Sequence, residues 1–97
     1  MLFEWDETKR QANLAKHLID FADAVKVFEG PVFGKVQRRH DENRVLAVGL
    51  LEDVEIVVIY TMRGKYRRII SARRANRNER QDYANQLKAA DERRNRP

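Results

Sequence analysis

Four adjacent β-branched residues, Ile56-Val57-Val58-Ile59, place the strongest constraint on how this chain can fold. Successive side chains of a β-strand point to opposite faces of a sheet, so a run that is apolar at every position needs cover on both faces. A strand in the middle of a sheet receives that cover. We therefore predict that Glu55–Thr61 is the central strand of a sheet.

The flanking segments predict an antiparallel meander around this strand. Arg44–Leu51 precedes it across the acidic turn Glu52-Asp53, and Arg67–Arg73 follows it across the turn Arg63-Gly64-Lys65. Phe33–Arg38 carries a weaker strand pattern. These segments together predict a small antiparallel sheet.

Helix-capping residues mark two N-terminal helices. Asp6 predicts a helix over Glu7–His17, after the apolar run Leu2–Trp5, which can pair as an edge strand. Asp20 predicts a second helix that ends at Glu29-Gly30-Pro31. Its apolar stripe has helical spacing: Phe21, Ala24, Val25 and Phe28.

A third helix is predicted at the C-terminus. Asn76 and Glu79 have the spacing of a capping box, and the helix they begin is predicted to reach about Ala90, with a frayed basic tail over 91–97. The chain is therefore expected to be one α+β domain over residues 1–90, in which N-terminal helices pack on a small antiparallel sheet and a C-terminal helix follows it.

Positive charge is concentrated in the last third of the chain. Residues 1–62 carry 8 Lys and Arg against 11 Asp and Glu, a net charge of −3, whereas residues 63–97 carry 12 against 4, a net charge of +8. This asymmetry favours a polyanionic partner, either nucleic acid or an acidic protein. A solvated basic surface would give the same pattern.

Several function classes are disfavoured by composition. The chain has no cysteine, and its two histidines, His17 and His40, are far apart in sequence, so no metal site and no cofactor are expected. The usual phosphate-loop, serine-elbow and zinc motifs are absent. The N-terminus lacks the pattern of a signal peptide, and no apolar stretch approaches the ~20 residues that span a bilayer, so a soluble cytoplasmic protein is expected.

Four blocks of the sequence resemble, in order and spacing, the BrnT family of toxins. They are FEWDETKRQANLAKH (Phe3–His17), IDFADAVKVFEGP (Ile19–Pro31), VVIYTMRG (Val57–Gly64) and RRIISARRANRNERQDY (Arg67–Tyr83). The resemblance implies a RelE-like ribonuclease toxin of a type II toxin–antitoxin system that inhibits translation. It also implies a BrnA-like ribbon-helix-helix antitoxin as partner, with operator DNA bound only through the complex.

Three positions depart from the family pattern. The chain has Leu18 where the family usually has glycine after the Lys-His pair, which implies strain or a different junction between the first two helices. It also has Gly30 where aspartate is common, and Arg67 where an aliphatic residue is common.

Metal-free RNA cleavage needs a group that accepts the 2′-OH proton, cations that stabilise the phosphorane-like charge, and a group that protonates the leaving 5′-oxygen. The family motif favours Arg68 and Arg73 as catalytic cations, and Arg63 in the turn and His17 are further candidates. Each has a structural alternative: a surface salt bridge for Arg68, a tie to Glu79 for Arg73, solvation for Arg63, and a helix C-terminal contact for His17.

Further RNA contacts are expected at Lys65, Arg67, Ser71 and Tyr83. Tyr83 could stack on a base, or it could anchor the last helix in the core. If the third strand has no bulge, Arg67, Ile69, Ser71 and Arg73 share one face, and the sequence does not decide which face is open. A non-catalytic binding module with a basic groove is the alternative function.

Overall fold

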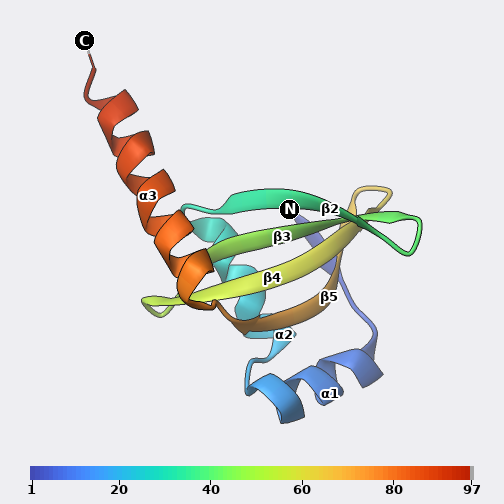
Figure 1. Cartoon of the computed structure of the whole chain (residues 1–97). Helices are drawn as coiled ribbons and strands as arrows, with labels where there is room; N and C mark the ends of the chain where they lie inside the picture. Colours follow the sequence, from blue (N-terminus) through green and yellow to red (C-terminus); the bar gives the residue numbers. More distant parts are fainter. Residues whose placement is uncertain (97) are drawn as a thin grey trace.

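The computed structural model describes residues 1–96 and has the predicted α+β architecture. Its five strands form one sheet in the order β1-β5-β4-β3-β2. Figure 1 shows β2, β3, β4 and β5 side by side in this sheet. The β1–β5 pair is parallel and the other pairs are antiparallel. The strands are β1 (Leu2–Glu4), β2 (Phe33–Arg39), β3 (Glu42–Leu51), β4 (Val54–Arg63) and β5 (Tyr66–Arg74).

The central position predicted for Ile56–Ile59 is confirmed, because β4 is the third of the five strands. Val57 and Val58 are fully buried although they point to opposite faces. We call the face that carries Ile56, Val58 and Tyr60 the inner face, and the opposite face the outer face. The main core lies on the inner face, where Phe21, Ala24 and Val27 pack against these side chains.

Two tight hairpins hold the register of β2, β3 and β4. Their central residues are His40-Asp41 and Glu52-Asp53, and all four have positive φ, between 50° and 65°. A two-residue turn in which both residues have left-handed backbone conformation matches the twist of the flanking strands, although asparagine and glycine usually stand at these two positions. The acidic turn at Glu52-Asp53 is thereby confirmed.

A β-bulge in β5 decides which side chains share a face. Ile59 pairs with Ser71 and Tyr60 with Ile69, so Ile70 is the extra residue. Ile69 and Ala72 consequently both enter the core on the inner face. The alternation given for a strand without a bulge therefore does not apply: Arg67 and Ile69 point inward, whereas Arg68, Ser71 and Arg73 belong to the outer face.

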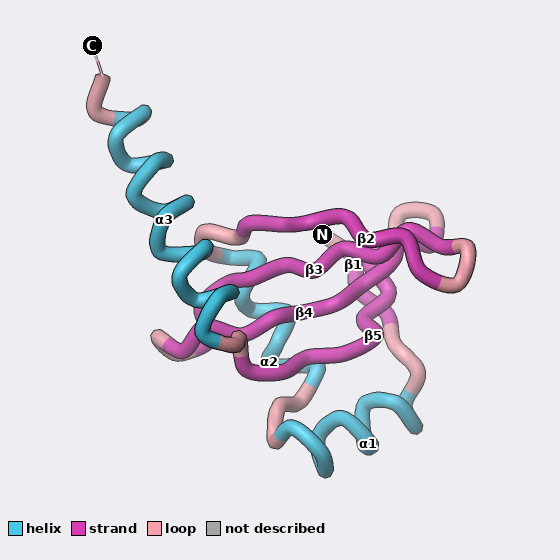
Figure 2. The backbone as a smooth tube through the Cα atoms, viewed as in Figure 1, coloured by secondary structure: helices cyan, strands magenta, loops and turns pink. Residues whose placement is uncertain are grey.

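The N-terminal segment closes the other edge of β5. β1 pairs with residues 66–68, and α1 (Glu7–His17) follows, with its N-terminus capped by Asp6 as predicted. Beyond the end of β1, the buried side chain of Asn13 forms the backbone hydrogen bonds that a neighbouring strand would form with β5. Its Nδ2 donates to Ala72 O at 2.9 Å, and its Oδ1 accepts from Ala72 N–H at 3.2 Å. This pairing fixes α1 beside the sheet, where Figure 2 shows it next to the lower end of β5.

Leu18 ends α1 in the left-handed conformation, with φ of 60° and a side chain that is 82% exposed. The strain expected from replacing glycine here is therefore present.

The second predicted helix is split. α2 (Phe21–Ala24), capped by Asp20, continues as the 3₁₀ helix η1 (Val25–Glu29). The tighter turn lies against the sheet at Gly49, where a Cβ would come within 2.9 Å of Val27 Cβ. Close packing of Val27 on β3 is thus a physical reason for the departure from one regular helix.

α3 (Arg77–Arg94) begins at the predicted capping box of Asn76 and Glu79. Its first turns pack on the outer face through Tyr83, and the remainder extends away from the sheet (Figure 1). The helix continues past Ala90 to Arg94, whereas the sequence predicted a frayed tail from Asp91; Arg93 and Arg94 in the last turn suit the helix dipole. Pro97 lies outside the described residues. Among residues 1–96 no helix is long and apolar enough to cross a membrane.

Candidate RNA-binding site

Polar side chains form a row across the outer face of the sheet. Glu4 pairs in register with Arg68, Arg68 with Thr61, and Arg44 with Gln37. Val45 pairs with Tyr60 in an antiparallel ladder, so Arg44, one residue before Val45, lies opposite Thr61, one residue after Tyr60. The row therefore runs through all five strands, beyond the part of this face that α3 covers.

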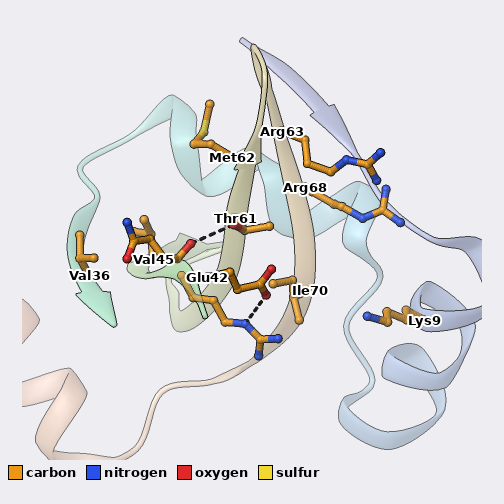
Figure 3. A pocket seen from close by; sticks show the side chains of 11 residues that line it. Lys9, Val36, Glu42, Val45, Thr61, Met62, Arg63, Arg68 and Ile70 are labelled. Atoms are coloured by element: carbon orange, nitrogen blue, oxygen red, sulfur yellow. Dashed lines mark hydrogen bonds and ion pairs between the residues drawn. The ribbon is translucent and has the colours of Figure 1, made fainter. Parts of the chain in front are cut away.

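This row borders a hollow of about 680 Å³. Sheet residues form its floor, and α1 contributes Lys9 to its wall, as Figure 3 shows. Its charged and polar lining side chains include Lys9, Glu42, Arg44, Thr61, Arg63 and Arg68. Four cations and one carboxylate among these residues give the hollow a positive charge suited to phosphate.

Arg63 and Arg68 meet at one end of the hollow. Arg68 Nη1 donates to Glu4 Oε2 at 2.9 Å, and Arg63 Nε lies 3.9 Å from Glu4 Oε1. Arg63 is the more exposed of the two, with 61% of its side chain accessible against 27% for Arg68. One carboxylate therefore draws two guanidinium groups together beside the hollow.

Lys9 and Arg44 line the hollow and are candidate site residues that the sequence analysis did not single out. Arg44 Nε donates to Glu42 Oε1 at 2.8 Å, and Thr61 Oγ1 donates to Asn43 O at 2.9 Å, which holds this end of the hairpin. The period-2 pattern of β3 could have placed Arg44 opposite Thr61. Lys9 had no such signal, because the Asn13 contact that places α1 is not visible in the sequence.

Arg73 lies outside this hollow and forms a pair with Glu79. Its Nη1 and Nη2 donate to the two Glu79 oxygens at 2.8 and 2.9 Å. The hydrogen bonds that Arg73 donates to Glu79 lower the pKa of Glu79 and raise the pKa of Arg73. Glu79 also accepts from Asn76 N–H, so the pair joins β5 to the start of α3. Of the two alternatives for Arg73, the structure therefore has the pair with Glu79.

Two expected RNA contacts lie elsewhere in the molecule. Arg67 points to the inner face, where its Cζ is 5.5 Å from the Phe28 ring centroid and 5.4 Å from that of Tyr60. Its Nε is buried without a hydrogen-bond partner in the described part of the chain. Tyr83 is 3% exposed and its hydroxyl donates to Pro31 O at 2.8 Å, so it anchors α3 and offers no free face to a base. Burial raises the pKa of its hydroxyl.

His17, Ser71 and Lys65 do not line this hollow. His17 and Ser71 line a shallower hollow of about 310 Å³ with Lys16; this hollow adjoins the larger one, because both contain Lys9 and Ile70. Ser71 Oγ donates to Asn13 Oδ1 at 3.4 Å. Lys65 is exposed in the β4–β5 turn. The structure thus places Arg63 and Arg68 in one hollow, His17 and Ser71 in the next, and Arg73 in neither.

The donor set favours anion binding. Within residues 1–96 no three His, Asp or Glu side chains gather in a metal-binding group. Guanidinium groups bind two phosphate oxygens at once, and an ammonium adds a compact charge. The fold and site define an α+β protein whose sheet carries a cationic, phosphate-compatible hollow.

Comparison with known families identifies the kind of protein. The family described as "Ribonuclease toxin, BrnT, of type II toxin-antitoxin system" matches residues 5–79, and the chain belongs to this family. The match includes Lys9, Arg44, Arg63 and Arg68 and begins one residue after Glu4. No curated protein matches the chain. Membership makes the protein a ribonuclease toxin with RNA as substrate and a cognate antitoxin as partner.

Proposed function

We propose that this toxin is a metal-independent endoribonuclease that cleaves RNA by attack of a ribose 2′-OH on the adjacent phosphate, and that it thereby inhibits translation. The convergence of Lys9, Arg44, Arg63 and Arg68 on one hollow carries this proposal. An open, cationic sheet face accommodates a single strand better than an enclosed pocket would. The α+β arrangement supports kinship with RelE-like toxins.

Arg63 and Arg68 are proposed to hold the scissile phosphate. Both guanidinium groups approach the same carboxylate, so they are already oriented toward one anionic position. Such preorganised cations stabilise charge that develops on the phosphate oxygens in the transition state, with no reorganisation during the reaction. Lys9 and Arg44 add two more positive charges to the lining of the hollow.

Other predicted residues receive different roles in this proposal. Arg73 braces α3 against β5 and acts on the reaction only by keeping that surface in place. His17 and Ser71 contact a neighbouring nucleotide in the adjoining hollow, and Lys65 attracts the strand at the hairpin end. Arg67 supports the inner face by stacking on Phe28 and Tyr60.

The cognate antitoxin is proposed to be a ribbon-helix-helix protein that neutralises the toxin by covering the hollow or α3. Past Tyr83 the helix has no buried residue up to Asn95, and it extends from the body of the protein. Co-expression of a ribbon-helix-helix protein encoded beside the toxin should restore growth. Failure of that protein to bind the toxin would contradict this part of the proposal.

A cleavage assay with purified protein, mixed-sequence RNA and EDTA tests the activity. We expect RNA fragments that end in 2′,3′-cyclic phosphate and 5′-hydroxyl groups. RNA that stays intact at high protein excess while it binds would favour the non-catalytic binding module. Cleavage that EDTA abolishes would refute metal independence alone.

A further inference from the structure

Glu4 is the carboxylate that touches both arginines proposed to hold the scissile phosphate. Its Oε2 accepts from Arg68 Nη1 at 2.9 Å, whereas its Oε1 lies 3.9 Å from Arg63 Nε, beyond hydrogen-bonding distance. The side chain is 30% exposed, on the outer face beside the hollow. Oε1 therefore keeps lone pairs that can accept another proton.

The backbone fixes this position. β1 is only three residues long, and its last residue pairs in register with Arg68. Register partners point to the same face, so Glu4 and Arg68 project side by side toward the outer face. Phe3 meanwhile packs against Phe28 on the inner face and holds the strand there. Glu4 is thus placed by packing and pairing rather than by a flexible loop.

We propose that Glu4 is the general base of RNA cleavage, which rests on the function proposed above. The Glu4 carboxylate takes the proton of the 2′-OH as the 2′-oxygen forms its bond to phosphorus. The bond from phosphorus to the 5′-oxygen breaks, and the departing oxygen takes a proton from the Lys9 ammonium group. Solvent then takes the proton from Glu4 and returns one to Lys9, and the products are a cyclic phosphate and a 5′-hydroxyl.

The shared arginines are the reason for choosing this carboxylate. The attacking 2′-oxygen sits next to the phosphate that is attacked, so a base must lie beside the cations that bind that phosphate. A guanidinium carries five N–H donors, and the bond to Glu4 uses one donor of Arg68, which leaves others for phosphate. One group can therefore hold the base and the phosphate together.

Glu42 is the other carboxylate at the hollow, and it has a different setting. It binds Arg44 two residues along the same strand and is 41% exposed. β3 is separated from β5 by β4, so Glu42 lies two strands away from Arg68. Glu42 therefore orients Arg44, whereas Glu4 has the position for proton transfer.

The test compares three Glu→Gln variants on an RNA whose cleavage site has been mapped with wild-type protein. Glu4→Gln should cut at least ~100-fold more slowly, the usual size of a general-base contribution. Glu42→Gln should reduce the cleavage rate by a smaller factor than Glu4→Gln does. Glu7→Gln removes an arginine-paired carboxylate outside the hollow and should cut at the wild-type rate.

Binding separates a base from a positioning residue. The same oligonucleotide with a 2′-deoxy group at the scissile position cannot be cut, and Glu4→Gln should bind it within about threefold of wild type, because the cations remain. Glu4→Asp keeps a carboxylate and should cut faster than Glu4→Gln. If Glu4→Gln does not fold, Glu4→Asp decides the matter through its cleavage rate, which should be reduced while its binding is not.

Three outcomes would overturn the inference. One is cleavage by Glu4→Gln within about threefold of wild type. Another is a loss of analogue binding in proportion to the loss of rate, which would make Glu4 a positioning residue for the arginines. The third is wild-type protein that does not cut RNA at all, which would overturn the proposed function with it.

Discussion

β5 carries two arginine–glutamate pairs, Arg68–Glu4 and Arg73–Glu79, which are similar in burial and differ in what surrounds them. The arginine side chains are 27% and 29% exposed and the glutamates 30% and 20%. Arg73 donates through two nitrogens to both Glu79 oxygens, and Glu79 also caps α3. Within residues 1–96, Arg68 uses one donor for its hydrogen bond and borders the large hollow.

The contrast shows that residue type and burial do not assign a role to an arginine. Free donors beside open space suit a ligand, whereas a pair joined by two parallel hydrogen bonds to both carboxylate oxygens holds two elements together. We therefore propose substrate binding for Arg68 and a structural role for Arg73.

Arg68→Ala gives the largest expected effect, and it falls on activity. Removing one preorganised donor from a charge-stabilising site costs ~10²–10³ in rate, so the RNA-cleavage rate should fall by about that factor. The Tm should fall less than in Arg73→Ala, because Arg68 forms one hydrogen bond to its glutamate whereas Arg73 forms two. Arg77→Ala, which removes an exposed arginine on α3, serves as the matched control and should keep both rate and Tm.

A loss of stability with full activity in Arg68→Ala would reverse the assignment. In that case Arg68–Glu4 would be the structural pair. The comparison of the two pairs would then have no functional meaning.

Arg73→Ala should lower the free energy of unfolding. Hydrogen bonds to charged groups contribute ~1.5–3 kcal/mol, and partial exposure lowers this, so we expect urea denaturation to show a loss of about 1–3 kcal/mol. At temperatures where the variant is folded, its cleavage rate should stay within a few-fold of wild type. Arg74→Ala, the exposed neighbour on the same strand, should change stability by less than ~0.5 kcal/mol. A folded Arg73→Ala variant without activity would restore Arg73 to the catalytic site.

The contribution of Arg73 should depend on pH. Glu79 has an ordinary pKa of 4.5, and the hydrogen bond from Arg73 lowers it in the folded protein. The unfolded chain therefore takes up the proton at higher pH, so the stabilisation is complete above about pH 5 and is lost as pH falls through the lowered folded pKa. The difference in unfolding free energy between wild type and Arg73→Ala should shrink below about pH 4.5. A difference that stays constant to the lowest pH at which the protein folds would contradict this linkage.

Local signals made much of the fold predictable from the sequence. The capping residues Asp6, Asp20 and Asn76 each begin the predicted helix, and the apolar run at Ile56–Ile59 gave the central strand. In each case the cause is contained within a few residues of the chain. Such signals carry over directly from sequence to structure.

Non-local contacts made the site harder to predict. The pairing of Glu4 with Arg68 joins residues 64 positions apart, and the Asn13 contact that places Lys9 joins residues 59 positions apart. The bulge at Ile70 places Arg73 on the same face as Arg68 and on the opposite face from Arg67, and it has no signature in residue type. These features arise from tertiary packing, so the basic character of the segment was visible while the choice among its arginines was not.

The effect of Lys9→Ala on RNA binding should be the smallest of these, and it is measured through the salt dependence of binding, separately from the slower cleavage that the loss of the proton donor should cause. Each phosphate contact to a single strand contributes ~0.7 to the slope of log K against log salt concentration, so losing Lys9 should reduce that slope by about this amount. Lys26→Ala makes the same change of charge at an exposed lysine beside Asp23 and should leave the slope unchanged, as should Arg73→Ala. An unchanged slope in Lys9→Ala would show that α1 does not line the RNA path, whereas a reduced slope in Arg73→Ala would bring the second pair of β5 into contact with RNA. The difference between the two pairs would then be one of degree and not of role.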